Sequence, residues 1–131
     1  MGKSGEISAA NYVARKYGIK AMMMIGTARK LCPNLVVLPY EFEEYKRVSD
    51  TMYEIMFGYT ARVQPMSIDE AYIDVTGLSA KDVIDVFEMR TGDRMSTSDV
   101  QDITVGSLVA MCIRKEIKAK TGCDASAGIG P

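Results

Sequence analysis

The sequence predicts an α+β fold: an antiparallel sheet with helices packed on one face, together with a small helical subdomain near the N-terminus. Two amphipathic helix patterns and one pair of alternating runs support this prediction. In residues 41–59 and 104–120, apolar side chains recur every three or four positions, as in half-buried helices. Residues 62–68 and 71–76 lie between them and alternate like two paired strands.

Short elements precede the first long helix. Residues 10–17 have a helical pattern that ends at Gly18, and residues 25–31 have another that a Cys-Pro-Asn segment stops. The apolar residues LVVL, at 35–38, include two valines, so we expect a short strand there.

The long helix at residues 41–59 is predicted to bury one of its faces. Charged residues fill one side, and an apolar stripe occupies the other. We expect that stripe to pack in the core rather than to bind a cofactor. It consists of Phe42, Tyr45, Val48, Met52, Ile55, Met56 and Tyr59.

A helix start signal follows the paired strands. Ser79 and Asp82 have the spacing of a capping box, and the helix that they begin is expected to end near Arg90. The polar residues 91–99 are predicted to form a surface loop before the second long helix. The final residues, CDASAGIGP at 123–131, are predicted to form one more strand.

The composition restricts the possible functions. The chain has 131 residues, 47% of them hydrophobic and 25% charged, as in a soluble globular domain. No apolar run approaches the length of a membrane span, and the most apolar patch, AMMMIG, is far too short, so we expect no membrane partner. It has no histidine and three scattered cysteines, which argues against a zinc site. Any bound metal is therefore expected to be a hard cation held by carboxylates.

Charge is distributed unevenly along the chain. Residues 1–30 carry six basic groups and one acid, a balance of +5, and the remainder carries ten basic groups and sixteen acids, a balance of −6. This arrangement suits an anionic ligand held between cations and a metal. An ordinary solvated surface explains the same asymmetry.

The adjacent acids Asp69 and Glu70 lie where the two predicted strands must reverse. Asp-Glu is a poor hairpin turn, because Asn-Gly or Asp-Gly supplies the positive φ angles more readily. At a tight bend both carboxylates can point at one place, where they repel each other unless a divalent cation lies between them. The alternative is two solvated acids on an exposed turn.

Four segments resemble the Y-family, or translesion, DNA polymerases in order and spacing. SIDEAYIDVTG resembles the family's S-x-D-E-A motif, and NYVARKYGIKAMM resembles its N-Y-x-A-R-x-x-G-[VI] segment. LCPNLVVLPYEFEEYKRVS is similar to the stretch that follows, and SAGIGP to the last strand of the palm. Within the family, PYEFEEYKRVS, the Tyr53–Ile55 region and DVTG resemble the deoxycytidyl-transferase branch most closely. The ending ASAGIGP is also similar to the kappa or DinB-like branch, which comes next.

The resemblance assigns roles to four residues. Asp69 matches a catalytic, metal-binding carboxylate of the palm, and Glu70 matches its partner nearest the primer terminus. Tyr12 and Arg15 match the residues that grip the triphosphate of the incoming nucleotide. Their i, i+3 spacing in a helix places a phenol and a guanidinium on one face, which suits phosphate oxygens. The alternative is a surface arginine beside a packed tyrosine.

The resemblance also implies the wider activity. Residues 1–40 would form part of the fingers and residues 41–131 part of the palm. The expected reaction is two-metal-ion transfer of deoxynucleotides, dCMP above all, opposite damaged template bases. The expected cofactor is Mg²⁺, or else Mn²⁺. The expected partners are primer–template DNA, a deoxynucleoside triphosphate and, through regions outside this sequence, replication or repair proteins, and the expected location in a eukaryote is the nucleus.

Parts of the family pattern have no counterpart in these residues. The first palm strand, D-x-D-x-F-[FY], is absent, and it supplies a third metal carboxylate in the family. The thumb and the additional DNA-gripping domain are absent too. We therefore expect the isolated chain to be inactive. One alternative is a non-catalytic truncated paralogue that acts as an interaction module, and another is a small cation-binding protein unrelated to polymerases.

Overall fold

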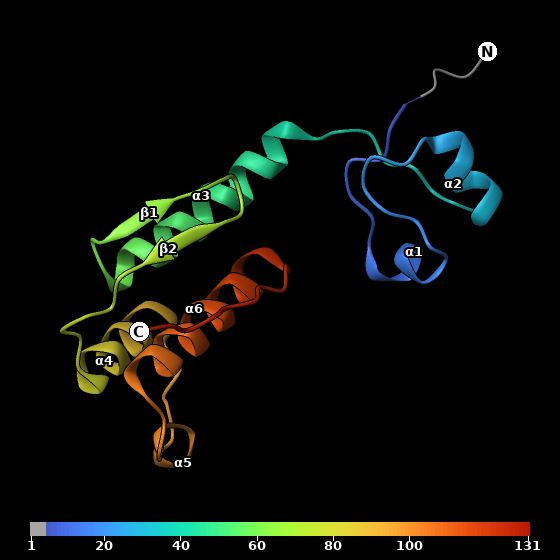
Figure 1. Cartoon of the computed structure of the whole chain (residues 1–131). Helices are drawn as coiled ribbons and strands as arrows, with labels where there is room; N and C mark the ends of the chain where they lie inside the picture. Colours follow the sequence, from blue (N-terminus) through green and yellow to red (C-terminus); the bar gives the residue numbers. More distant parts are fainter. Residues whose placement is uncertain (1–4) are drawn as a thin grey trace. The chain divides into compact units, whose positions relative to one another are not determined.

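The computed structural model describes residues 5–131. The chain forms two compact units, Met1–Tyr40 and Glu41–Pro131 (Figure 1). The first unit contains the short helices α1 (Tyr12–Lys16) and α2 (Ile25–Leu31). The side chain of Asn11 accepts a hydrogen bond from the backbone of Ala14 and so caps α1. Both helices predicted for this part of the chain are confirmed.

The first unit has only a small core. Among its described residues, 5–40, the buried apolar ones are Ile19 and Ala28. The segment after α1 turns back to lie beside the N-terminal residues, where the amide of Ile7 donates to the carbonyl of Met23 at 2.8 Å. A backbone contact therefore helps to close a unit that leaves most of its large apolar side chains exposed.

The strand predicted at residues 35–38 is wrong. This segment has no regular secondary structure, and Val36 and Leu38 are exposed. Valine favours a strand only where a neighbouring strand supplies hydrogen bonds and a surface to pack on. Within residues 5–131 the segment has no such partner, and it leads instead from the first unit to the second.

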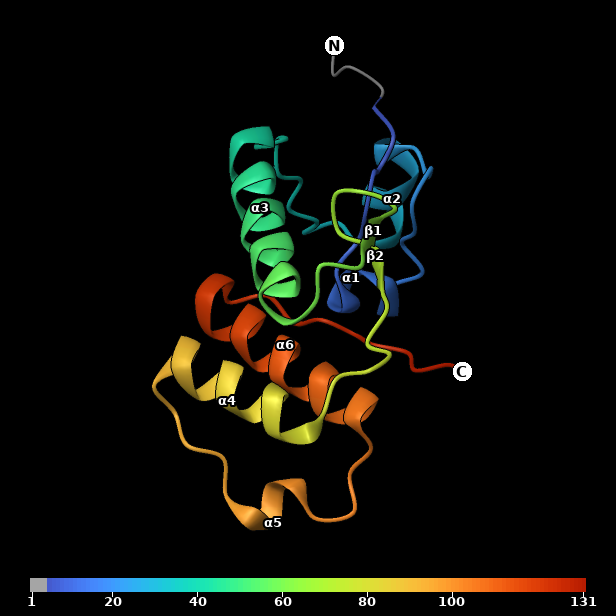
Figure 2. The same ribbon diagram turned by 90° about the vertical axis from the view of Figure 1, so that its left-hand side faces the viewer.

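The second unit has three long helices around one core. They are α3 (Phe42–Tyr59), α4 (Ala80–Thr91) and α6 (Val105–Thr121), and α6 packs against both others (Figure 2). The predicted Ser79–Asp82 capping box begins α4, and Thr104 caps α6. The core residues are Met52, Ile55, Tyr59, Val83, Phe87, Leu108, Val109, Cys112, Ile113 and Ile117.

The apolar stripe predicted on α3 is confirmed only in its second half. Met52, Ile55 and Tyr59 are buried, but Phe42 and Tyr45 at the start of the helix are exposed. The core cluster takes residues of α3 only from Met52 onward, because α4 and α6 pack against that end. An amphipathic pattern shows which face is apolar, but the neighbouring helices decide how much of it is covered.

A two-stranded antiparallel hairpin completes the second unit. It pairs β1 (Val63–Pro65) with β2 (Ala71–Ile73), and within residues 5–131 it is the only sheet. The predicted alternation of β2 is confirmed, since Ile73 packs toward the helices while Tyr72 is exposed. Both strands are shorter than predicted, since residues 66–70 form a connecting loop after β1, and β2 already ends at Ile73.

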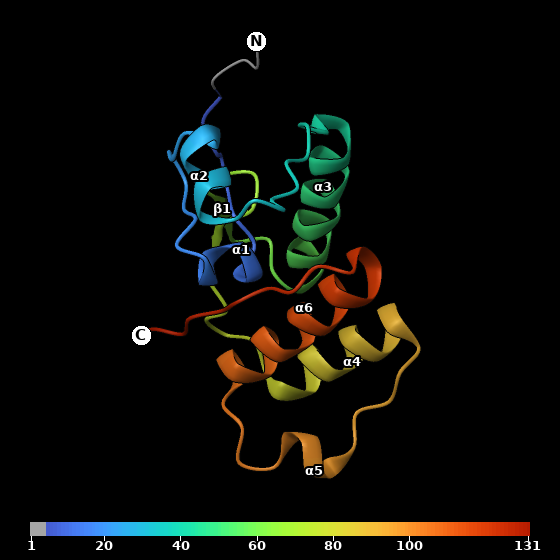
Figure 3. The ribbon, with the colours of Figure 1, turned by 90° about the vertical axis from the view of Figure 1, so that its right-hand side faces the viewer.

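The chain after α3 differs from the sequence prediction at two further places. The predicted loop at residues 91–99 contains a short helix, α5 (Thr97–Val100), which a second capping box from Ser96 and Asp99 begins (Figure 3). The predicted strand at residues 123–131 is wrong. Residues 123–131 have no regular secondary structure and do not pair with the hairpin. They return along α6, where Arg114 Nε donates to the carbonyl of Ala125 at 2.7 Å.

A buried polar network connects the three long helices. Glu116 of α6 is 1% exposed, and its carboxylate accepts hydrogen bonds from the hydroxyl of Tyr59 (2.6 Å) and from Arg90 Nε (3.0 Å). Gly58 makes room for that arginine, because a Cβ there would lie 2.5 Å from Arg90 Nη1. A buried charge is tolerated only when it is paired in this way.

The same core makes stability fall at alkaline pH. Burial raises the pKa of the Cys112 thiol to about 11, whereas an unfolded cysteine titrates near 8.5. Above that value the unfolded chain loses a proton that the folded chain keeps, so the free energy of unfolding decreases as pH rises. We expect a loss of up to about 3 kcal/mol by pH 11. Urea unfolding between pH 7.5 and 11 measures it, and a Cys112→Ala variant with an equally steep pH dependence would contradict this assignment.

Candidate active site

The loop of residues 66–70 carries both predicted acids. It joins β1 to β2, and the amides of Met66 and Ser67 both donate to the carbonyl of Glu70, at 2.9 and 3.1 Å. The chain therefore reverses at Asp69 and Glu70, where the sequence indicated. Their metal-binding and catalytic roles stay predictions.

The hydroxyl of Ser67 lies next to both carboxylates. Its oxygen is 2.9 Å from Asp69 Oδ1 and 3.4 Å from Glu70 Oε2. A hydroxyl has one proton, so it donates fully to one carboxylate at a time. Since the same atom reaches both, the two carboxylates lie on the side of the loop that faces the Ser67 hydroxyl, and both side chains are exposed to solvent.

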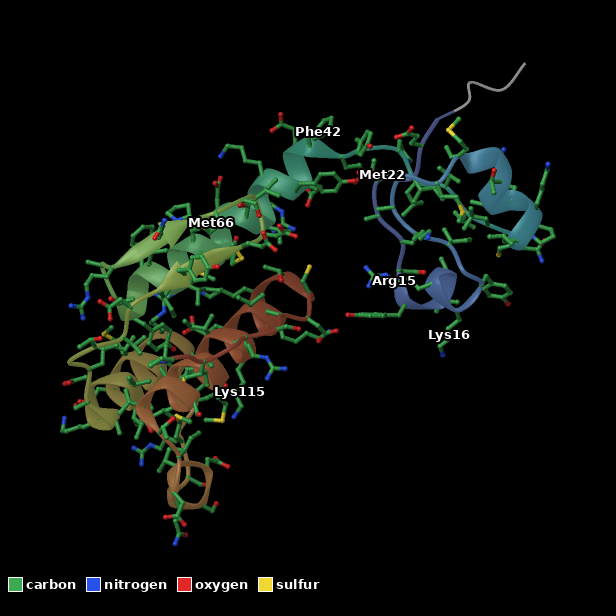
Figure 4. The ribbon with its side chains drawn as sticks, viewed as in Figure 1. Arg15, Lys16, Met22, Phe42, Met66 and Lys115 are labelled. Carbon is green, nitrogen blue, oxygen red and sulfur yellow. The ribbon has the colours of Figure 1, made fainter. Side chains whose placement is uncertain are left out.

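Two hydroxyl side chains of α3 hold this loop, and sequence reasoning missed them as site residues. The hydroxyl of Tyr53 lies 2.6 Å from the carbonyl oxygen of Ser67, and Ser49 donates to the carbonyl of Ile68. Figure 4 shows Met66, the first loop residue, on the hairpin that lies along α3. The sequence feature that could have indicated them is the spacing of Ser49 and Tyr53, which are four residues apart and therefore lie on one face of the helix.

The opposite end of the hairpin is fixed by a second set of contacts. Thr60 Oγ1 donates to the carbonyl of Asp74 at 2.9 Å, and Arg62 Nε forms an ion pair with the Asp74 carboxylate at 3.2 Å. Hydrogen bonds from Thr76 hold the pKa of Asp74 below its usual value, and Arg62 adds to this effect. Asp74 is therefore engaged in structural contacts near the hairpin base.

The predicted triphosphate-binding pair lies on α1. The guanidinium carbon of Arg15 is 5.0 Å from the ring centre of Tyr12, and Arg15 Nε donates to the carbonyl of Ala10 at 2.8 Å. Figure 4 shows Arg15 on this short helix. Both side chains are exposed, so the phenol and the outer guanidinium nitrogens face solvent. The structure brings these two residues together within the first unit. Their nucleotide-binding role stays a prediction.

The donor set in the loop suits a hard cation. Mg²⁺ prefers oxygen ligands and is commonly held by one or two carboxylates together with water and substrate phosphates. Asp69 and Glu70 provide two such carboxylates. Among the described residues, 5–131, no group of three or more potential metal-ligating side chains is found. The two acids therefore fit a cation that takes its remaining ligands from elsewhere.

Comparison with known proteins identifies the family. The profile described as the impB/mucB/samB family matches residues 1–131. The chain belongs to this family. It is 42% identical over 127 residues to the DNA repair protein REV1 of Arabidopsis thaliana, covering 97% of this chain and 9% of REV1. It is 37% identical over 129 residues to DNA polymerase IV of Francisella tularensis subsp. novicida, covering 98% of this chain and 31% of that polymerase.

Solved structures of polymerases share the fold of this impB/mucB/samB chain. The crystal structure of DinB from Sulfolobus solfataricus matches with a TM-score of 0.67 and 27% identity, over 95% of this chain and 30% of that one. An insertion ternary complex of Dbh DNA polymerase matches with a TM-score of 0.66 and 27% identity, over 95% of this chain and 31% of that one. A Y-family DNA polymerase chimera matches equally well, with a TM-score of 0.67 and 26% identity. The predicted Y-family resemblance and α+β fold are confirmed.

The matches also define the extent of the likeness. The chain spans about a third of the polymerase IV relative and less than a tenth of REV1. Within residues 5–131, none of the helices combines the length and the apolar character that crossing a bilayer requires.

Proposed function

We propose that this chain supplies fingers, residues 1–40, and part of the palm, residues 41–131, to a translesion DNA polymerase. The polymerase would transfer deoxynucleotides to a primer end on damaged template DNA. The observation that carries the proposal is the loop of the β1–β2 hairpin, where one hydroxyl touches the carboxylates of Asp69 and Glu70. Membership of the impB/mucB/samB family supports it.

Each predicted site residue has a defined part in this proposal. Asp69 and Glu70 hold divalent metal, Mg²⁺ or Mn²⁺, through their exposed oxygens. When bound, the metal would activate the primer 3′-hydroxyl and neutralise the charge of the leaving pyrophosphate. Arg15 and Tyr12 bind and orient the triphosphate, because a guanidinium fork and a phenol hydroxyl both match phosphate oxygens.

The preferred nucleotide is proposed to be dCTP. The support is the resemblance of the segment PYEFEEYKRVS, at residues 39–49, and of DVTG, at residues 74–77, to the deoxycytidyl-transferase branch. The proposed macromolecular partner is primer–template DNA, with replication or repair proteins binding elsewhere on the polymerase. In a eukaryotic cell the proposed location is therefore the nucleus.

A chimera tests the proposal. This chain would replace the matching segment of DNA polymerase IV, which it resembles at 37% identity, so that the remainder of that polymerase supplies the other domains. We expect Mg²⁺-dependent primer extension over an abasic template. Each nucleotide is supplied alone, and a shift toward dCTP relative to unmodified DNA polymerase IV would support the proposed preference. A folded chimera without extension would contradict the proposal and favour a non-catalytic interaction module.

An Arg15→Ala variant of the chimera tests the triphosphate contact. A lost charged hydrogen-bond partner costs about 1–3 kcal/mol, so we expect kcat/KM for the nucleotide to fall by about 5- to 150-fold. Steady-state primer extension at varied dCTP concentration measures this change. Arg29→Ala, at an exposed arginine on α2, is the matched control and should leave kcat/KM unchanged. Equal values for the two variants would remove Arg15 from the site.

A further inference from the structure

The backbone carbonyl groups of the acidic loop, residues 66–70, show how this loop is held in place. The carbonyl oxygen of Glu70 accepts hydrogen bonds from the amides of Met66 and Ser67, at 2.9 and 3.1 Å. These two bonds occupy both of its lone pairs. The hydroxyl of Tyr53 lies 2.9 Å from this oxygen and 2.6 Å from the carbonyl oxygen of Ser67. Its single proton therefore belongs to the bond with Ser67, which is the shorter one and has no competing donor.

The next carbonyl is satisfied in the same way. Ser49 Oγ donates to the carbonyl of Ile68. Ser49 and Tyr53 are four residues apart on α3, so they lie on one helix face and reach two successive carbonyls of the loop. No other donor to these two carbonyls is found in the described part of the chain.

These two bonds determine where the acids lie. Fixing the carbonyls of Ser67 and Ile68 fixes peptide units 67–68 and 68–69, the two that immediately precede Asp69, and the amides of Met66 and Ser67 fix the carbonyl of Glu70. The Ser67 hydroxyl can touch both carboxylates only while the loop keeps this path. We propose that Ser49 and Tyr53 are positioning residues, whose hydroxyls hold the loop so that the two carboxylates converge on one cation.

The part of this inference that concerns metal rests on the proposed function, whereas the part that concerns the loop does not. If the hydroxyls of Ser49 and Tyr53 served only to stabilise the fold, removing them would change the free energy of unfolding and nothing else. Tyr53 also packs against the core cluster, but Tyr53→Phe removes only the hydroxyl and keeps the ring. A change in the loop signals and in metal affinity, with little change in stability, therefore distinguishes positioning from packing.

The test uses the 131-residue chain with Tyr53→Phe and Ser49→Ala. Tyr72→Phe is the matched control, since Tyr72 lies in the same hairpin with its side chain exposed. NMR would record the amide signals of Met66 and Ser67, and added Mn²⁺ would broaden the signals of residues 69 and 70. Loss of a hydrogen bond that orients a metal ligand typically weakens metal binding by tenfold or more. We expect about tenfold weaker Mn²⁺ binding and shifted, faster-exchanging amides in both variants, with the control unchanged.

Each outcome separates the two claims. Unchanged loop amides in Tyr53→Phe and Ser49→Ala, or Mn²⁺ affinity equal to that of the unmodified chain, would overturn the positioning role. If the amides shift in both variants but the unmodified chain shows no Mn²⁺ broadening at residues 69 and 70, the positioning of the loop stands. In that case the proposed metal site fails instead.

Discussion

Replacing Asp69 with asparagine should reduce primer extension by the chimera about a thousandfold or more. The amide keeps the size of the side chain and can still accept a hydrogen bond from Ser67, which lies 2.9 Å from Asp69 Oδ1. It removes the negative charge that a divalent cation requires. Metal stabilisation of the transition state is worth several kcal/mol, and about 4 kcal/mol corresponds to a thousandfold change in rate. Single-turnover extension at saturating dCTP and Mg²⁺ measures the loss.

Controls separate this effect from misfolding. Asp85→Asn makes the same chemical change at an exposed carboxylate on α4, where the partner is Lys81, and should leave the rate unchanged. Glu70→Gln should lose activity as Asp69→Asn does, since both acids are proposed to hold metal. Free energies of unfolding within about 0.5 kcal/mol of that of the parent chimera would show that the fold of each variant is intact. Full activity in Asp69→Asn would refute the catalytic role of this carboxylate.

The sequence predicted the parts of the fold that local signals determine. The capping box of α4, the helix pattern of α6 and the reversal at Asp69 each depend on residues close together in the chain. The contact between Tyr12 and Arg15 follows in the same way from i, i+3 spacing within one short helix.

The features that the sequence did not predict depend on partners distant in the chain. Residues 35–38 and 123–131 have strand-like composition, but within the described residues 5–131 neither segment pairs with a strand. The exposure of Phe42 depends on where α4 and α6 end their contact with α3. Local patterns do not predict the contact of Tyr53 with Ser67, because it joins residues that are 14 positions apart in the sequence.

Removing the buried carboxylate of Glu116 should lower the free energy of unfolding by several kcal/mol. Glu116→Ala removes the carboxylate that pairs with Arg90, whose side chain is only 17% exposed. It also leaves the hydroxyl of Tyr59 without the acceptor of its hydrogen bond. Removing one member of a buried ion pair typically costs 3–5 kcal/mol, because the remaining charge stays desolvated and unpaired. We expect a loss of about that size in urea unfolding at pH 7. Since a domain of this size has only about 5–15 kcal/mol of stability, Glu116→Gln, which keeps the acceptor, is the variant to use if Glu116→Ala does not fold.

The loss of stability expected for Glu116→Ala comes from leaving the charge of Arg90 buried and unpaired. Two further variants test whether this unpaired charge, rather than lost packing, causes the loss. Asp50→Ala removes a carboxylate from an exposed ion pair with Lys46 on α3, and it should cost less than about 1 kcal/mol. The double variant Arg90→Met with Glu116→Leu removes both charges and retains side-chain volume, so it should be more stable than Glu116→Ala alone. A double variant that is less stable than Glu116→Ala would show that the hydrogen bonds of the network, rather than the desolvated charge, dominate its contribution. If Glu116→Ala cost no more than Asp50→Ala, the network would not be holding the three helices together.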